Sequence, residues 1–128
     1  MSTILMIEDN VNDALLLQRE LRRYGLRNPI VTYTYPEAAI IHLESNYEST
    51  VLILLDLAYE GGHIDGYKFL DHLHNTPGRF IPVIIISGSE PYKTRAFKHG
   101  ALEFMVKPVH ANQLIDALHR IGLSWSIG

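Results

Sequence analysis

Short, almost entirely apolar runs alternate in this chain with longer amphipathic segments, and this alternation restricts the fold more than any other feature. Two of the runs, 51–55 (VLILL) and 81–86 (IPVIII), contain no charged or hydrogen-bonding side chain. Strands of this kind are buried on both faces, as in a parallel sheet covered by helices on each side. The expected strands are Thr3–Ile7, Pro29–Tyr33, Thr50–Leu55, Ile81–Ile86 and Leu102–Val106.

The segments between these runs carry apolar residues at helical spacing, together with signals for helix ends. Leu17 and Leu21 lie on one helical face, and the pattern ends before Gly25, a natural C-terminal stop. Thr34 and Glu37 match a capping box that would open a second helix. Three further helices are expected between Asp65 and Pro77, from Ser89 to Gly100, and over Leu114, Ile115, Leu118 and Ile121. The strand–helix unit repeated five times predicts an α/β sandwich with a five-stranded parallel sheet.

Composition and charge exclude several classes of protein. The 128 residues are enough for one domain, and we expect a single domain over 1–128. The net charge of −3 argues against a nucleic-acid partner. The absence of cysteine excludes disulfides and thiolate metal sites. Since no leader or membrane-spanning apolar run is visible, we expect a cytoplasmic protein that binds no membrane.

Charged and polar residues follow four of the five expected strands. Glu8 and Asp9 follow the first strand, Asp56 the third, Ser87 the fourth and Lys107 the fifth. Because the carboxyl ends of parallel strands meet at one edge of the sheet, these side chains are expected to converge there. Three carboxylates side by side repel one another, so we expect a Mg²⁺ ion among them.

Such a set suits phosphoryl transfer, which needs mainly positioning and neutralisation of charge. A carboxylate can act as the nucleophile, while Lys107 and Ser87 contact the phosphoryl oxygens and Gly88 leaves room for the group. Taken alone, Asp56 is as often a turn residue, and Lys107 is more often a solvated strand end. The occurrence of all of them at one edge favours the functional interpretation.

Four stretches of the sequence resemble receiver domains of two-component response regulators. They are 4–10 (ILMIEDN), 52–57 (LILLDL), 81–87 (IPVIIIS) and 100–108 (GALEFMVKP), and the resemblance covers essentially the whole chain. It implies a flavodoxin-like (βα)₅ fold with strand order 2-1-3-4-5. It also implies that Asp56 is the phosphoacceptor and that Asp9 and Asp56 bind Mg²⁺ directly.

The resemblance assigns roles to further residues. Glu8 would bind the Mg²⁺ directly or through water, and the backbone carbonyl of Ala58 would complete the protein ligands. Ser87 and Phe104 match paired switch positions that move together on phosphorylation. The Lys107–Pro108 peptide bond is expected to be cis.

The same resemblance implies a signalling domain that catalyses only its own phosphorylation and dephosphorylation. Its phosphodonor would be a sensor histidine kinase, and without an output domain it would signal by protein contact. The close of the chain, 123–127 (LSWSI), is similar to stand-alone regulators paired with bacterial phytochromes. A homodimer is expected through the fourth helix, fifth strand, fifth helix and this tail. The candidate contacts there are Tyr92, Arg95, Phe97 and Lys98, with Glu103 and Arg120 nearby.

The sequence departs from the family pattern in two places. The segment 58–66 (AYEGGHIDG), after the acceptor, is long, rich in glycine and without the usual proline. Phe104 lacks the hydroxyl that many receivers carry at this switch position. Ala58 and Ser89 offer no carboxylate or carboxamide to orient an attacking water, which predicts slow self-dephosphorylation.

Two other classes of protein remain as alternatives. A binding module that works without phosphorylation would keep the fold, but the intact acidic and lysine set argues against it. A flavin-binding domain would need a hydroxyl-rich loop after the first strand, where this chain has Glu8, Asp9 and Asn10. His72 and His74 are two positions apart on a helix, do not face one another and are expected to be surface residues.

Overall fold

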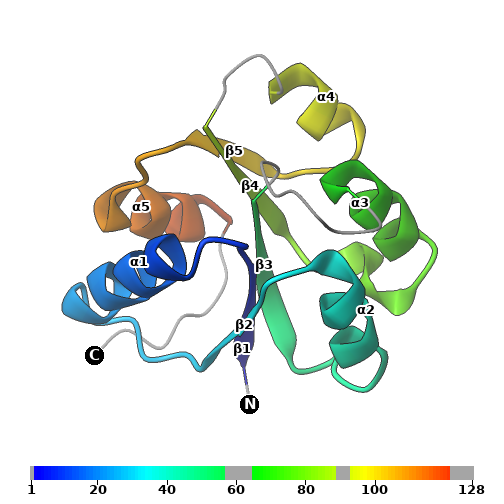
Figure 1. The fold of residues 1–128 in the computed structure, drawn as a ribbon, viewed down its shortest axis with the longest axis horizontal. Coiled ribbons are helices and arrows are strands. Elements are labelled where there is room, and N and C mark those ends of the chain that lie inside the picture. The colour runs from blue at the N-terminus through cyan, green and yellow to red at the C-terminus, as the bar shows by residue number, and fades with distance from the viewer. Residues whose placement is uncertain (1, 57–64, 89–92, 122–128) are drawn as a thin grey trace.

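The chain folds into three layers, with a parallel five-stranded sheet between two layers of helices (Figure 1). The computed structural model describes residues 2–56, 65–88 and 93–121. The sheet order is β2-β1-β3-β4-β5, which confirms the expected topology. The elements are β1 (Thr3–Ile7), α1 (Val11–Arg23), β2 (Ile30–Tyr33), α2 (Pro36–Glu44), β3 (Thr50–Asp56), α3 (Gly66–His74), η1 (Pro77–Phe80), β4 (Val83–Ser87), α4 (Lys93–Lys98), β5 (Glu103–Val106) and α5 (Ala111–Ile121).

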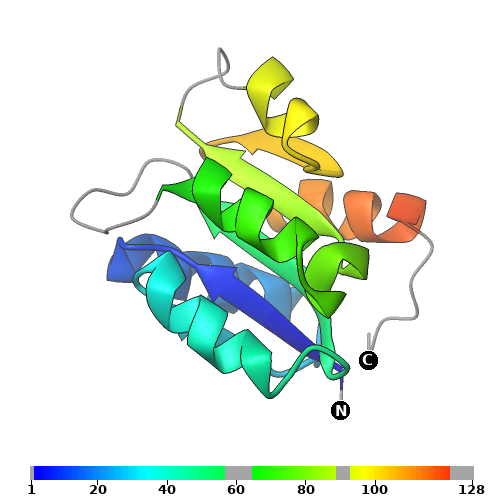
Figure 2. The same cartoon turned by 90° about the vertical axis from the view of Figure 1, so that its right-hand side faces the viewer.

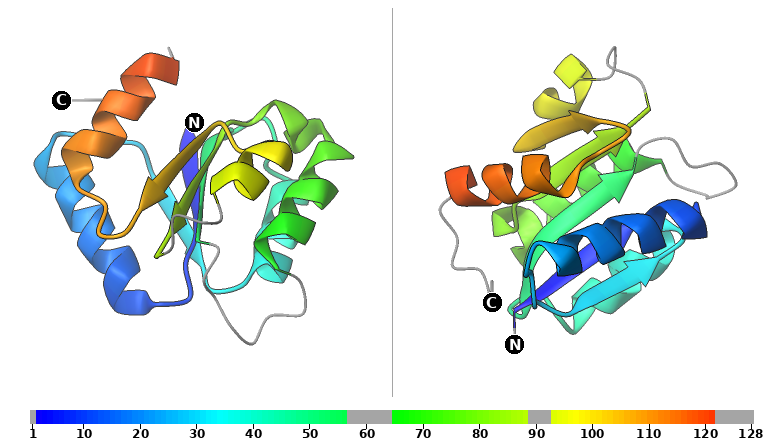
Figure 3. Two further views of the ribbon diagram at one scale, coloured as in Figure 1. Left: turned by 90° about the horizontal axis from the view of Figure 1, so that it is seen from above. Right: turned by 90° about the vertical axis from the view of Figure 1, so that its left-hand side faces the viewer.

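Alternation of side chains along the central strands creates two separate cores. Leu5, Ile53 and Ile85 face the layer formed by α2, α3 and α4, whereas their neighbours Met6, Leu54 and Ile84 face α1 and α5. The view from above in Figure 3 shows these two helical layers on either side of the sheet. Burial of β3 and β4 on both faces explains why their sequences are almost entirely apolar.

Local signals fix the ends of several helices. The side chain of Asn10 accepts a hydrogen bond from the backbone N–H of Asp13 at the start of α1, and Asp65 caps α3 in the same way. Gly25 follows α1 with φ of 93°, a left-handed conformation that favours glycine. None of the helices in the described ranges is long and apolar enough to cross a bilayer.

Several expected boundaries differ from the structure: β2 begins at Ile30 rather than Pro29, β3 ends at Asp56 rather than Leu55, and β5 begins at Glu103 rather than Leu102. The capping box of Thr34 and Glu37 is wrong, because the cap residue is Tyr35, its side chain makes no capping bond, and Pro36 opens α2. The fourth strand begins at Val83 rather than Ile81, since Pro82 has no N–H to donate and residues 77–80 form η1. The described part of the fourth helix begins at Lys93, and the expected start at Ser89 lies outside the described residues.

The strand ends that matter for function lie together at one edge of the sheet. β1, β3 and β4 run parallel with Ile7 beside Leu55 and Asp56 beside Ile86. Ser87 at the end of β4 pairs with Val106 at the end of β5, so Lys107 follows directly at the same edge. Figure 2 shows the arrows of the sheet running in parallel.

Candidate functional site

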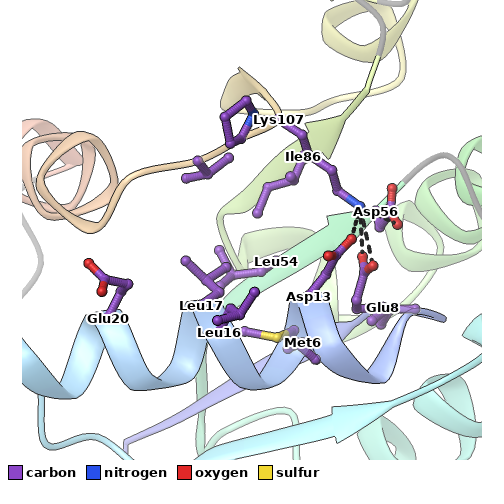
Figure 4. Close-up of a pocket in the computed structure, with 14 residues that line it drawn as sticks. Met6, Glu8, Asp13, Leu16, Leu17, Glu20, Leu54, Asp56, Ile86 and Lys107 are labelled. Atoms are coloured by element: carbon purple, nitrogen blue, oxygen red, sulfur yellow. Dashed lines mark hydrogen bonds and ion pairs between the residues drawn. The ribbon is translucent and has the colours of Figure 1, made fainter.

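A single lysine binds three carboxylates at this edge. The Lys107 Nζ lies 3.0 Å from Asp56 Oδ2, 3.2 Å from Glu8 Oε1 and 3.3 Å from Asp13 Oδ2. Figure 4 shows these side chains directed toward the lysine amine, Glu8 from the position after β1, Asp13 from α1 and Asp56 from the end of β3. The side chain of Asp56 is only 2% exposed, so its charge depends on the partners that surround it.

The backbone holds this lysine in place. The Lys107 N–H donates to the Ser87 carbonyl oxygen at 2.8 Å, which ties the residue after β5 to the end of β4. The Lys107–Pro108 peptide bond is cis, which confirms that expectation. Glu8 is fixed at the end of β1, where its N–H donates to the Tyr33 carbonyl oxygen at 3.0 Å.

Three acidic side chains form a group that fits a hard divalent cation. Oxygen atoms from Glu8, Asp9 and Asp56 all lie within 4.8 Å of one another. Mg²⁺ takes oxygen ligands, usually one or two carboxylates together with water, and this donor set matches that preference. Of the expected ligands, the backbone carbonyl of Ala58 lies outside the described residues.

Crowding of negative charge perturbs the titration of this group. Burial, a hydrogen bond to Asp56 and the charge of Asp56 raise the pKa of Glu8 from 4.5 to about 8, although Lys107 opposes the shift. Burial disfavours the charge on Lys107, but its hydrogen bonds and the charges of Asp56 and Glu8 raise the pKa of this lysine above its ordinary value. The cluster therefore holds more negative charge than its one lysine compensates.

The two expected switch residues, Ser87 and Phe104, belong to the face of the sheet that α3 and α4 cover. Ser87 is fully buried and continues the row of Val83 and Ile85, whose side chains face α3 and α4. Phe104 is half-buried and packs against the same cluster. Ser89, expected to influence the phosphoryl lifetime, lies outside the described residues, as do 57–64 of the long segment and the tail from 122.

Asp13 is the site residue that the sequence reasoning missed. It lies in the first turn of α1, four residues after Asp9, and its carboxylate contacts Lys107 across the site. The signal was present, since α1 begins at the same edge of the sheet and its first turn faces the strand ends. A search limited to strand ends could not find a helical residue.

A pocket of about 380 Å³ opens from the site along α1. Glu8, Asp13, Asp56 and Lys107 form its polar end, shown in Figure 4. Its other walls are mostly apolar side chains from the strands, α1 and the segment before α5, and they are Met6, Ile7, Ala14, Leu16, Leu17, Leu54, Ile86, Pro108 and Val109, with Glu20 beside them. The polar end of the pocket thus continues into an apolar groove.

A (βα)₅ sandwich with an acidic cluster and a lysine at its carboxyl edge has the features of a phosphorylation-dependent signalling domain. Residues 4–119 match the response regulator receiver domain family. The chain belongs to this family, which confirms the resemblance found in the sequence.

The chain also aligns with named regulatory proteins. The chain is 28% identical over 121 residues to the cyclic di-GMP phosphodiesterase response regulator RpfG of Xanthomonas campestris, covering 87% of this chain and 29% of RpfG. It is 26% identical to the probable methanogenesis regulatory protein FilR2 of Methanothrix harundinacea, covering 95% of this chain and 82% of FilR2. With 29% of RpfG and 15% of the nitrogen assimilation regulatory protein NtrX of Azorhizobium caulinodans covered, the chain spans under a third of these two.

Solved structures give the same classification. The bacteriophytochrome response regulator AtBRR superposes with a TM-score of 0.83 at 28% identity, covering 100% of this chain and 97% of AtBRR. The receiver domain of NtrX from Brucella abortus gives 0.77 at 27% identity, covering 91% and 95%. The bacteriophytochrome response regulator RtBRR gives 0.85 at 24% identity, covering 100% and 82%, and supports the fold alone.

Proposed function

We propose that this receiver accepts a phosphoryl group on Asp56 from a phosphohistidine of a sensor histidine kinase in a Mg²⁺-dependent reaction. The observation that carries the proposal is the buried Asp56 carboxylate, bound by the Lys107 amine at 3.0 Å inside a group of acids. A carboxylate held in this way, in the lining of a pocket, is suited to attack phosphorus.

The transfer changes no oxidation state, so it needs no oxidant or reductant. An oxygen of Asp56 forms a bond to phosphorus as the phosphorus–nitrogen bond of the donor breaks. The bonding electrons go to the histidine nitrogen of the donor, which leaves as imidazole after taking a proton. Asp56 then carries an acyl phosphate, whose added negative charge lies beside Lys107.

Glu8, Asp9 and Asp56 would hold the Mg²⁺, with the backbone carbonyl of Ala58 as a further ligand. The bound ion supplies positive charge that neutralises the phosphoryl oxygens and aligns the donor. Lys107 donates hydrogen bonds to those oxygens. Ser87 contributes a hydroxyl, and with Phe104 it forms the pair of side chains that changes position when the phosphoryl group is present.

Asp9→Asn is expected to abolish Mg²⁺-dependent phosphorylation while the fold survives. Asp9 is partly exposed and lies beyond the end of β1, so the change removes the negative charge of a metal ligand without opening the core. The protein would be incubated with a small phosphodonor and Mg²⁺ or with a chelator, and followed by intact-protein mass spectrometry. Asp116→Asn, an exposed change on α5, is the matched control. Phosphorylation of Asp9→Asn at the wild-type rate would refute the metal assignment.

The family and its relatives support a proposal for the kinase and the cellular setting. Similarity to AtBRR, a bacteriophytochrome response regulator, favours a bacterial phytochrome as the sensor kinase. The receiver domain over 1–128 would act in the cytoplasm and signal by protein contact, without binding nucleic acid or membrane. A net charge of −3 is consistent with a protein partner rather than a nucleic acid.

The dimer surface would consist of α4, β5 and α5, with the tail beyond Ile121. Three large apolar side chains on α4 and around β5, Phe97, Leu102 and Val106, are exposed to solvent. Arg120 and Glu103 form an ion pair within the chain at 3.5 Å, so they provide fixed charges at the border of this surface. An apolar centre with a charged border suits a surface that meets its own copy across a two-fold axis.

Leu102→Glu is expected to weaken this dimer at least about tenfold, because a charge would replace a buried apolar contact at the interface. Light scattering across a concentration series, with and without phosphodonor, measures the dissociation constant. Leu15→Glu on α1, an equally exposed leucine, is the matched control and should leave the dimer intact. A monomeric wild-type protein at high concentration, phosphorylated or not, would rule the dimer out.

A further inference from the structure

We propose that Asp13 is a positioning residue, which keeps Lys107 beside Asp56 when the other carboxylates of the site are occupied. The inference rests on the proposed function, since it concerns the lysine that would bind the phosphoryl group. It adds a residue of α1 to a site whose other members lie at strand ends.

The first step is the hydrogen-bonding capacity of the lysine. An ammonium group has three N–H donors, and the Lys107 amine contacts three carboxylates. Asp56 is at 3.0 Å, Glu8 at 3.2 Å and Asp13 at 3.3 Å. All three donors are therefore used by acidic residues before any phosphoryl group arrives.

The second step distinguishes Asp13 from the other two partners. Glu8 and Asp56 belong to the group of acids whose oxygens lie within 4.8 Å of one another, and Asp13 does not. Its carboxylate is 46% exposed, whereas those of Glu8 and Asp56 are buried. The backbone N–H of Asp13 donates to Asn10 Oδ1 at 3.0 Å, which fixes this residue at the start of α1.

The third step follows from what a divalent cation does to a lysine. Carboxylates that bind a cation are weaker acceptors, and the cation repels the ammonium group. Of the three carboxylates around Lys107, Asp13 is the one outside the metal group, so it remains as an anchor. Two N–H groups of the lysine then become available for the phosphoryl oxygens on Asp56, while the third stays with Asp13.

The experiment compares Asp13→Asn with Glu20→Gln. Both changes remove one negative charge from α1 along the same pocket, but Glu20 pairs with Arg23 and not with Lys107. Relative to Glu20→Gln, we expect Asp13→Asn to slow phosphorylation by a small phosphodonor at saturating Mg²⁺ about threefold to fivefold, the size of a half-exposed ion pair. Asp13→Glu should recover most of the rate.

The second measurement is the Mg²⁺ dissociation constant, obtained by calorimetry without a phosphodonor. Without Asp13 the lysine stays on Glu8 and Asp56 and competes with the cation, so Asp13→Asn should raise this constant about threefold more than Glu20→Gln does. In a Lys107→Met background the two changes should have equal effects, because the competing lysine is gone. An excess effect of Asp13→Asn that persists there would show that Asp13 does not act through Lys107.

The outcomes separate this inference from the proposed function. If the wild-type protein takes up no phosphoryl group, the proposed function fails. If the wild-type protein is phosphorylated but Asp13→Asn matches Glu20→Gln in rate and in Mg²⁺ affinity, the positioning role of Asp13 is refuted and the phosphoacceptor role stands.

Discussion

Glu8→Gln should make the metal-free protein more stable at about pH 8.5 by about 1–3 kcal/mol. Burial and the neighbouring Asp56 raise the pKa of Glu8 from 4.5 to about 8. In the unfolded chain this carboxyl group loses its proton near its ordinary pKa. The folded protein therefore binds more protons than the unfolded chain across this window, and its stability falls as the pH rises from about 4.5 to about 8.

The substitution removes this titration, so the difference between variant and wild type should shrink toward zero as the pH falls to about 4.5. Chemical denaturation in a chelator at both pH values measures the difference. Glu20→Gln, on the half-exposed part of α1, is the control for the loss of one carboxyl group. A Glu8→Gln variant that is less stable than wild type at both pH values would contradict the raised pKa.

Added Mg²⁺ should reverse the order of stability at the higher pH. A cation that binds the folded protein but not the unfolded chain stabilises the fold, and the stabilisation grows with the affinity of the cation. The wild-type protein keeps the full set of Glu8, Asp9 and Asp56 and should gain more than the variant. The negative charge of Glu8 would thus destabilise the metal-free domain and stabilise the Mg²⁺-bound one.

The fold could be predicted from the sequence because the signals are strong and consistent. The continuous apolar runs of β3 and β4 are required by burial on both faces, and Gly25 stops α1 where the helical pattern ends. The prediction of a capping box at Thr34 and Glu37 was wrong because Pro36, two residues after Thr34, is an equally good first residue for a helix. Local patterns of four residues cannot decide between two such starts, since the packing of α2 on the sheet selects one of them.

The site was predictable to the extent that topology alone determines it. A parallel sheet carries Glu8, Asp9, Asp56, Ser87 and Lys107 to one edge, whatever their separation in sequence. The placement of Asp13 depends instead on how α1 turns its first residues toward Lys107, which is a matter of packing. The same holds for the apolar groove beside α1, whose walls come from residues that the sequence marks only as core or surface.

Asp56→Asn is expected to abolish phosphorylation. The carboxamide keeps the shape of the buried side chain but has no negative oxygen to attack phosphorus. It also removes one of the three carboxylates around Lys107, so the fold should survive and lose some of its crowding of negative charge. Circular dichroism of both proteins checks that the fold is intact.

The most direct test is to locate the phosphoryl group. Wild-type protein and Asp56→Asn are treated with a small phosphodonor and Mg²⁺, the acyl phosphate is reduced with borohydride, and the peptides are sequenced by mass spectrometry. We predict one phosphoryl group for each wild-type molecule, a reduced residue at position 56, and no label on Asp56→Asn. Equal labelling of the two proteins, or a label at another residue of the wild type, would contradict the assignment of Asp56 as the phosphoacceptor.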